Sequence, residues 1–125
     1  MSRIVVRSGS PYEDRYSFSR ALRVGDRILV AGTAPIEDDG SCGEGAGAQT
    51  RRCLQIIDHA LREVGASLQH VVRTRMFITD AADADEIGAV HGEMLREARP
   101  TATMVVVAGL LDPRWKVEIE AEALL

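Results

Sequence analysis

The sequence predicts an α+β fold, a two-layer sandwich in which a mixed sheet carries two helices on one face. Three observations lead to this prediction. Runs with the alternation of a β-strand occupy both ends of the chain, two stretches with helical periodicity lie between them, and the order is β-β-β-α-β-α-β-β. No repeat or linker interrupts this order, so residues 1–125 are expected to form one domain, long enough to bury a core.

The first three strands are predicted near the N-terminus. Arg3–Val6 has the pattern of a short strand, and the residues after it favour a turn. Ser17–Val24 and Arg27–Ala31 form a hairpin that turns at Gly25-Asp26. The acidic, glycine-rich segment that follows Pro35 (EDDGSCGEGAG) lacks the ligand spacing of a calcium-binding loop, so we expect a solvated loop there.

Two helices and a strand make up the middle of the chain. From about Ala46 to Val64 the apolar residues recur at helical spacing, and Gly65 is placed to end the helix. Val71–Thr79 returns to strand alternation, and Asp80 or Asp83 can cap a second helix. The predicted core stripes of the two helices are Cys53, Ile57, Ala60, Leu61 and Val64, then Ile87, Val90, Met94, Leu95 and Ala98.

The last two strands raise the functional question. Thr103–Leu110 is apolar on both faces, although two helices can cover only one face of the sheet, and this predicts an oligomer. Trp115–Ala123 alternates without a break, with Trp115 on its apolar face. The polar face of this strand carries Glu118, Glu120 and Glu122 and needs either water or a basic partner. Arg73 and Arg75, on a neighbouring strand, are the candidate partners.

The composition excludes several classes of function. The net charge is −4, the basic residues are scattered, and aromatic residues make up 4%, which argues against a nucleic-acid groove and a polybasic membrane surface. No apolar run has membrane-spanning length, and the N-terminus lacks a signal-peptide core, so a cytoplasmic protein is expected.

Metal, disulfide and covalent chemistry lack support in the sequence. The three histidines, His59, His70 and His91, do not have the spacing of a metal site. Cys42 and Cys53 are not expected to pair in a reducing compartment, and no serine or cysteine lies in a nucleophile motif. We therefore expect neither a metal nor covalent catalysis.

Three segments resemble the Rid family, the RidA/YjgF reactive-intermediate deaminases, which are also labelled L-PSP endoribonucleases. Phe18–Pro35 (FSRALRVGDRILVAGTAP) is similar to the first hairpin of that family, and Ala48–Asp80 is similar to its long helix and following strand. RPTATMVVVAGLLDPRWKVEIEAEAL resembles its closing strand pair, and VEIEA is the most specific piece. The resemblance covers nearly the whole chain in order and identifies residues 1–125 as a single Rid-like domain.

The resemblance carries expectations about structure and activity. It implies a fold similar to chorismate mutase, a homotrimer, and clefts at the subunit boundaries. It also implies hydrolysis of enamines and imines released by pyridoxal-phosphate enzymes, without a cofactor in the Rid protein itself. The expected partners are a small, carboxylate-bearing organic ligand and two further copies of the chain.

The functional residues of the family match this chain only in part. Glu118 on the closing strand and Gly32 at the strand end are retained. The arginine that grips the substrate carboxylate in the family is replaced by Ala102, and the family's tyrosine and glutamine align with Phe18 and Arg20. A charged hydrogen bond of the kind that this arginine makes is worth on the order of 1.5–3 kcal/mol. The chain therefore resembles the arginine-less relatives.

These residues define a candidate site. Glu118 is the candidate for holding or deprotonating the attacking water, although ion pairing with strand arginines would give it a purely structural role. Arg20 is the candidate anion-binding group, a solvated charge being the alternative, and backbone N–H groups near Thr103 are candidates for an oxyanion contact. Phe18, Gly32 and Ala102 complete the predicted binding residues.

Two functions from different classes remain open at this point. One is an imine or enamine deaminase, and the other is a trimer that binds a small ligand without turnover. An endoribonuclease fits poorly, because the chain is acidic and has no basic track.

Overall fold

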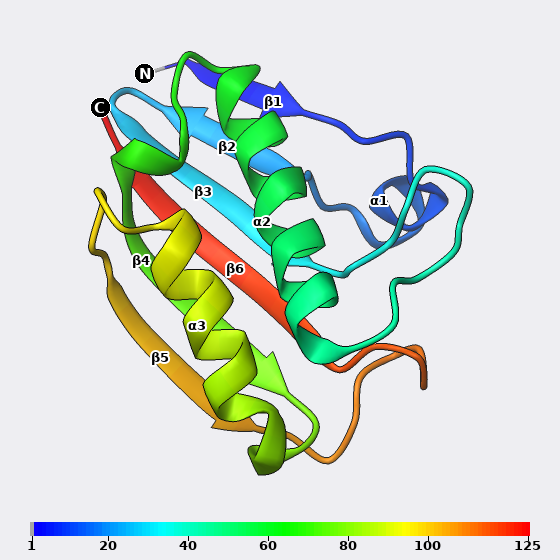
Figure 1. Ribbon diagram of the computed structural model, residues 1–125. Helices are drawn as coiled ribbons and strands as arrows, with labels where there is room; N and C mark the ends of the chain where they lie inside the picture. The colour runs from blue at the N-terminus through cyan, green and yellow to red at the C-terminus, as the bar shows by residue number, and fades with distance from the viewer. Residues whose placement is uncertain (1) are drawn as a thin grey trace.

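The computed structural model describes residues 2–125 and shows a six-stranded sheet with two helices packed on one face (Figure 1). The strands are β1 (Arg3–Val6), β2 (Ala21–Val24), β3 (Arg27–Thr33), β4 (Val71–Ile78), β5 (Thr101–Val106) and β6 (Val117–Leu124). The covering helices are α2 (Ala46–Arg62) and α3 (Ala84–Met94). The predicted α+β sandwich is confirmed.

The sheet is mixed, as predicted. Its strand order is β1-β2-β3-β6-β4-β5, so the last strand of the chain lies in the middle of the sheet. The β4–β5 pair is parallel and every other pair is antiparallel. The central position of β6 explains its pattern: Val117, Ile119 and Ala123 are buried under the helices, and the alternate glutamates point to the other face.

Helix α2 supplies much of the core. All five residues of its predicted stripe are buried, and Cys53, Ile57 and Leu61 are fully so. Burying a large aliphatic side chain stabilises the fold by roughly 1.5–3 kcal/mol, so this stripe anchors the helix to the sheet. Gly65 follows the helix with φ of 87°, the left-handed conformation that glycine adopts without strain.

Helix α3 is held less tightly. Ile87 and Leu95 are buried, and the other residues of the predicted stripe are only half-buried. Asp80 caps the turn η2 (Ala81–Asp83) that leads into the helix, accepting a hydrogen bond from the N–H of Ala82 at 2.9 Å. The turn η1 (Leu68–His70) connects α2 to β4 in a similar way.

The structure contains one helix that the sequence pattern did not reveal, α1 (Pro11–Tyr16). Ser10 caps it by accepting from the N–H of Tyr12, and Pro11 occupies its first turn. Ser17 ends this helix with a left-handed backbone (φ of 60°), and β2 begins at Ala21 rather than at the expected Ser17.

The last two strands also have different bounds from those expected. β5 begins two residues earlier, at Thr101, and ends at Val106 instead of continuing to Leu110. β6 begins at Val117, so Trp115 precedes the strand instead of alternating with its apolar face. The indole Nε1 of Trp115 is buried and has no hydrogen-bond partner within residues 2–125.

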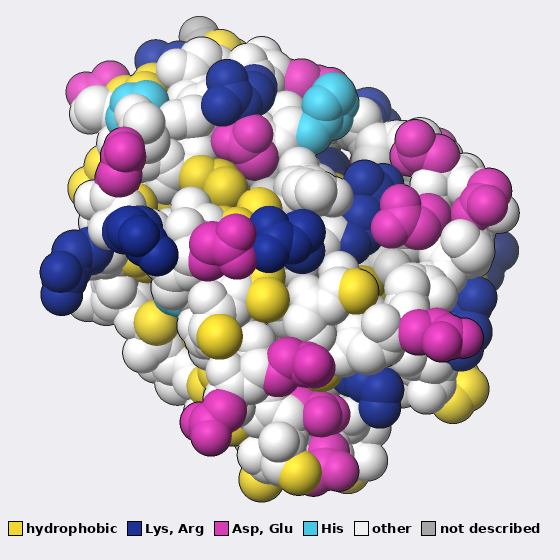
Figure 2. Space-filling view, viewed as in Figure 1, with side chains coloured by type: hydrophobic (Ala, Val, Ile, Leu, Met, Phe, Trp, Pro, Cys, Tyr) yellow, Lys and Arg dark blue, Asp and Glu magenta, His cyan; other side chains and the backbone are white. Residues whose placement is uncertain are grey.

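The two faces of the molecule differ in character. Figure 2 shows the helix-covered face, where acidic and basic side chains are interspersed. The opposite face of the sheet exposes apolar side chains, among them Val5, Leu29 and Val105. Within residues 2–125, no helix is both long and apolar enough to cross a membrane.

Candidate functional site

The three glutamates of β6 lie on the uncovered face of the sheet but have different neighbours. Glu120 accepts from Nη1 of Arg75 at 2.9 Å. Glu122 lies between Nη2 of Arg27, at 3.2 Å, and Nε of Arg73, at 3.8 Å. The predicted pairing with strand arginines therefore explains these two carboxylates.

Glu118 is the exception. The register of β4 against β6 places Phe77 opposite Glu118. Within residues 2–125, Glu118 forms no ion pair. The side chain is half-buried. A half-buried carboxylate without a cation in direct contact differs from one that only neutralises a strand face.

Gly32 lies directly beneath this carboxylate. The pairing of β3 with β6 shifts between Val30 and Thr33, and Gly32 lies within the irregularity. A Cβ atom at Gly32 would overlap Oε1 of Glu118. The absence of a side chain at position 32 is what allows the carboxylate to rest on the β3 backbone.

Arg20, the residue before β2, approaches Gly32 as well. Its Nη2 donates to the Gly32 carbonyl at 2.5 Å, and its guanidinium is largely buried. The structure thus brings together Glu118, Gly32 and Arg20, three of the six residues that the sequence singled out.

Burial and charge act in opposite directions on Glu118. Desolvation raises the pKa of its carboxyl group, Arg20 opposes that shift, and Glu120 adds to it. The pKa of Arg20 is lowered by burial, and Glu13 and Glu118 oppose that change. Burial and the Glu118 charge also raise the pKa of the Cys53 thiol, so Cys53 is a protonated core residue rather than a nucleophile.

A shallow hollow of about 500 Å³ lies on the uncovered face, and Glu118, Gly32 and Arg20 are not among the residues that line it. Phe18 lines it and is 42% exposed. Apolar side chains of β1 to β3 form one wall, and the Arg73, Arg75, Glu120 and Glu122 network forms the other.

Ala102 and Thr103 lie elsewhere within one chain. They belong to the edge strand β5, and β4 separates them from β6. In register, Thr103 is opposite Arg75 on the uncovered face, whereas Ala102 is opposite the buried Thr74 on the helix side. A single chain therefore does not bring these two positions to Glu118.

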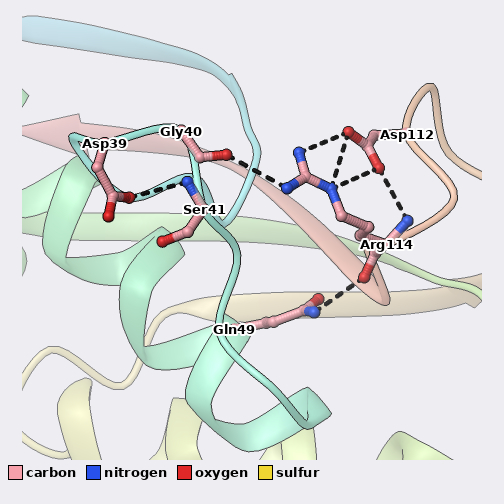
Figure 3. A network of polar contacts seen from close by, with 6 residues as sticks. All are labelled: Asp39, Gly40, Ser41, Gln49, Asp112 and Arg114. Atoms are coloured by element: carbon pink, nitrogen blue, oxygen red, sulfur yellow. Dashed lines mark hydrogen bonds and ion pairs between the residues drawn. The ribbon is translucent and has the colours of Figure 1, made fainter.

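The start of β6 is fixed by a polar network that the sequence did not indicate (Figure 3). The Gln49 amide donates to the carbonyls of Gly43 and Arg114, each at 3.0 Å, and its Oε1 accepts from the N–H of Lys116 at 2.7 Å. The guanidinium of Arg114 donates to the Asp112 carboxylate and, at 3.3 Å, to the Gly40 carbonyl. The glycine-rich loop and the segment before Glu118 are therefore tied to α2.

Glu13 is the second residue that the sequence analysis missed. It is 4% exposed, and it accepts from the N–H of Ser8 at 3.1 Å and from the Ser8 hydroxyl. The Ser-x-x-Glu spacing from Ser10 to Glu13, with Pro11 between them, is a helix N-terminus signature that could have revealed α1 and this glutamate.

Within residues 2–125, no three His, Cys, Asp or Glu side chains are grouped closely enough to hold a metal ion.

Comparison with known proteins agrees with the fold. Residues 11–125 match the model of the family described as Endoribonuclease L-PSP. The chain is 42% identical to Rv2704 of Mycobacterium tuberculosis, a member of the YjgF/YER057c/UK114 family; the match covers 99% of this chain and 100% of that crystal structure, with a TM-score of 0.91.

Two curated relatives are also similar over most of their length. The uncharacterized protein SCO2049 of Streptomyces coelicolor is 39% identical over 119 residues, which is 94% of this chain and 89% of that protein. The 3-aminoacrylate deaminase RutC of Acinetobacter baylyi is 34% identical over 106 residues, 82% of each chain.

Proposed function

The chain belongs to the Rid family, and from that premise we propose that it hydrolyses a small imine or enamine to a carbonyl compound and ammonia. The observation that carries the proposal is the environment of Glu118. It is the one carboxylate on the β6 face without an ion pair within residues 2–125, and desolvation raises its pKa. A raised pKa brings a carboxyl group closer to the range in which it both accepts and returns a proton.

The chemistry requires one group that accepts and returns protons in turn. Glu118 accepts a proton from water as the water oxygen bonds to the carbon of the protonated imine, giving a neutral carbinolamine. The same carboxyl then protonates the amino nitrogen. As the C–N bond breaks and ammonia leaves, the hydroxyl proton passes back to the Glu118 carboxylate and the carbonyl group forms. An enamine must first be protonated at carbon to give the imine. No cofactor is required for any of these steps.

A complete site in this proposal needs a second copy of the chain. Thr103 lies on an exposed edge strand, too far across the sheet to serve the Glu118 of its own chain. In a homotrimer, the backbone N–H groups near Thr103 of one copy would face the Glu118 of the next and stabilise the developing oxyanion. The exposed apolar side chains of the uncovered face supply surface for such an assembly.

A second candidate is a trimer that binds a small ligand without turnover. The observation that favours it is Ala102, a methyl group in the position where the family carries its carboxylate-binding arginine. Without that anchor, a 2-imino acid is poorly oriented for attack by water.

The two candidates are separated by measuring imine hydrolysis directly. A 2-imino acid released by an amino-acid oxidase, and an uncharged imine released by an amine oxidase, are each allowed to decay with and without the protein. We expect faster decay with the wild-type chain, and a loss on the order of a hundredfold in Glu118→Gln.

Glu122→Gln is the matched control, because it makes the same change two side chains further along the same strand face. It should retain turnover. Equal rates for Glu118→Gln and the wild type would contradict the proposal, and wild-type binding of either compound without faster decay would support the second candidate.

A further inference from the structure

Arg20 is held in place by its own backbone and by its side chain. Its N–H donates to the carbonyl of Val6 and its carbonyl accepts from the N–H of Ala31, each at 3.0 Å, which extends the ladder by one residue before β2. Its Nη2 donates to the Gly32 carbonyl at 2.5 Å. Nη2 of the guanidinium therefore already has a main-chain acceptor.

Gly32 is the point at which Arg20 and Glu118 meet. The guanidinium binds the carbonyl of this residue, and the carboxylate occupies the space where its Cβ would be. The Arg20 guanidinium and the Glu118 carboxylate thus both contact Gly32, although they form no direct ion pair within residues 2–125.

A second carboxylate faces Arg20 from α1. Glu13 is buried, and its charge acts on the guanidinium together with that of Glu118. The Nε of Arg20 is buried and has no hydrogen-bond partner within the described part of the chain. The Arg20 guanidinium is thus largely buried, bound to a main-chain carbonyl, and already opposed by the charges of two protein carboxylates, with which a ligand carboxylate would compete.

We propose that Arg20 is a positioning residue, which holds the Glu118 carboxylate over Gly32 and supplies its counter-charge rather than binding the ligand. This inference rests on the proposed function of Glu118. It assigns to Arg20 a role other than the anion binding expected from the sequence, and the two roles differ in their experimental consequences.

The consequence for Glu118 follows from the groups that face it. Arg20 is the cation that opposes the upward shift of its pKa, while desolvation and Glu120 raise that pKa and the Cys53 thiol remains protonated. Removing the Arg20 charge therefore moves the Glu118 pKa further upward. An Arg20 that binds the ligand anion would in addition strengthen the binding of carboxylate-bearing compounds, and its loss would raise KM for these compounds alone.

The first experiment compares Arg20→Gln with the wild type on the two imines, one with and one without a carboxylate. A positioning role predicts that kcat falls by about tenfold for both substrates, with the acid limb of the pH profile displaced to higher pH. Arg20→Lys, which keeps the charge, should restore part of the loss. A rise in KM confined to the carboxylate-bearing imine, with an unchanged pH profile, would overturn the inference.

The second experiment needs no turnover and so separates this inference from the proposed function. The Glu118 carboxyl is titrated by carbon NMR in the wild type, Arg20→Gln, Arg20→Lys and the control Arg27→Gln, which removes a cation paired with Glu122. An upward displacement in Arg20→Gln, absent in Arg27→Gln, supports the inference even if no imine is hydrolysed. Identical titration of Glu118 in Arg20→Gln and the wild type refutes it even in an active enzyme.

Discussion

At the C-terminal end of β6, Glu122 lies between Arg27 and Arg73, whereas at the N-terminal end Glu118 lies opposite Phe77 and over Gly32. The two residues are the same amino acid on the same face of the same strand. Their neighbours on β3 and β4 differ, and these neighbours make one a member of a surface ion-pair network and the other a desolvated carboxylate. A repeated charge pattern on a strand therefore does not imply a repeated role.

The largest expected effect comes from filling the space beneath Glu118. In Gly32→Ala the new methyl group overlaps Oε1 of Glu118, and the flexible carboxylate, not the backbone, has to move. We expect imine turnover to fall about a hundredfold, while the free energy of unfolding changes by less than about 1 kcal/mol.

Steady-state kinetics and urea unfolding test this prediction together. Gly109→Ala is the control, since its added Cβ would have no atom within 4 Å. Turnover retained in Gly32→Ala would show that the position of the carboxylate over Gly32 does not matter, and the distinction between the two ends of β6 would lose its functional meaning.

The fold followed from the sequence because its signals are long and periodic. The stripe of α2 and the alternation of β6 each extend over many residues, and both were located correctly except for the first two residues of the predicted β6 run. The helix α1 has only six residues, too few for a stripe, and only the Ser10-Pro11 cap could have indicated it. Trp115 was misplaced because alternation alone does not mark where a strand begins.

The candidate site followed from the sequence less completely. Glu118 and Gly32 came from a motif resemblance, and their proximity depends on the irregular pairing between Val30 and Thr33, which no pattern on β3 announces. The contrast with Glu122 depends on the β4–β6 register, which sets Phe77 opposite Glu118. Gln49 bonds Arg114 and Lys116 across 65 and 67 residues of sequence, and local spacing does not reveal such partners.

A smaller effect is expected from giving Glu118 an arginine neighbour like those of Glu120 and Glu122. Phe77→Arg would place a cation opposite Glu118, as Arg75 lies opposite Glu120, and would lower the Glu118 pKa. We expect turnover to fall about tenfold, because a carboxylate held in an ion pair is a weaker base. The pH dependence of turnover reports the change.

Phe77→Leu is the matched control, since it keeps an apolar neighbour, and it should remain close to the wild type. If Phe77→Arg and Phe77→Leu behaved alike, the apolar surroundings of Glu118 would not explain its proposed activity.

The smallest expected effect is on stability, and it should have opposite signs at the two ends of the strand. A folded-state pKa raised above that of the unfolded chain means that folding disfavours the charged form, so the stability that Glu118 contributes in acid is lost as the pH rises through its folded pKa. Glu118→Gln should therefore be more stable than the wild type near pH 7, and the difference should vanish near pH 3. Glu122→Gln loses its contacts with Arg27 and Arg73 and should be less stable near pH 7 by roughly 0.5–1 kcal/mol. Urea unfolding of both variants at the two pH values measures the signs, and equal signs near pH 7 would mean that the two carboxylates experience the same environment after all.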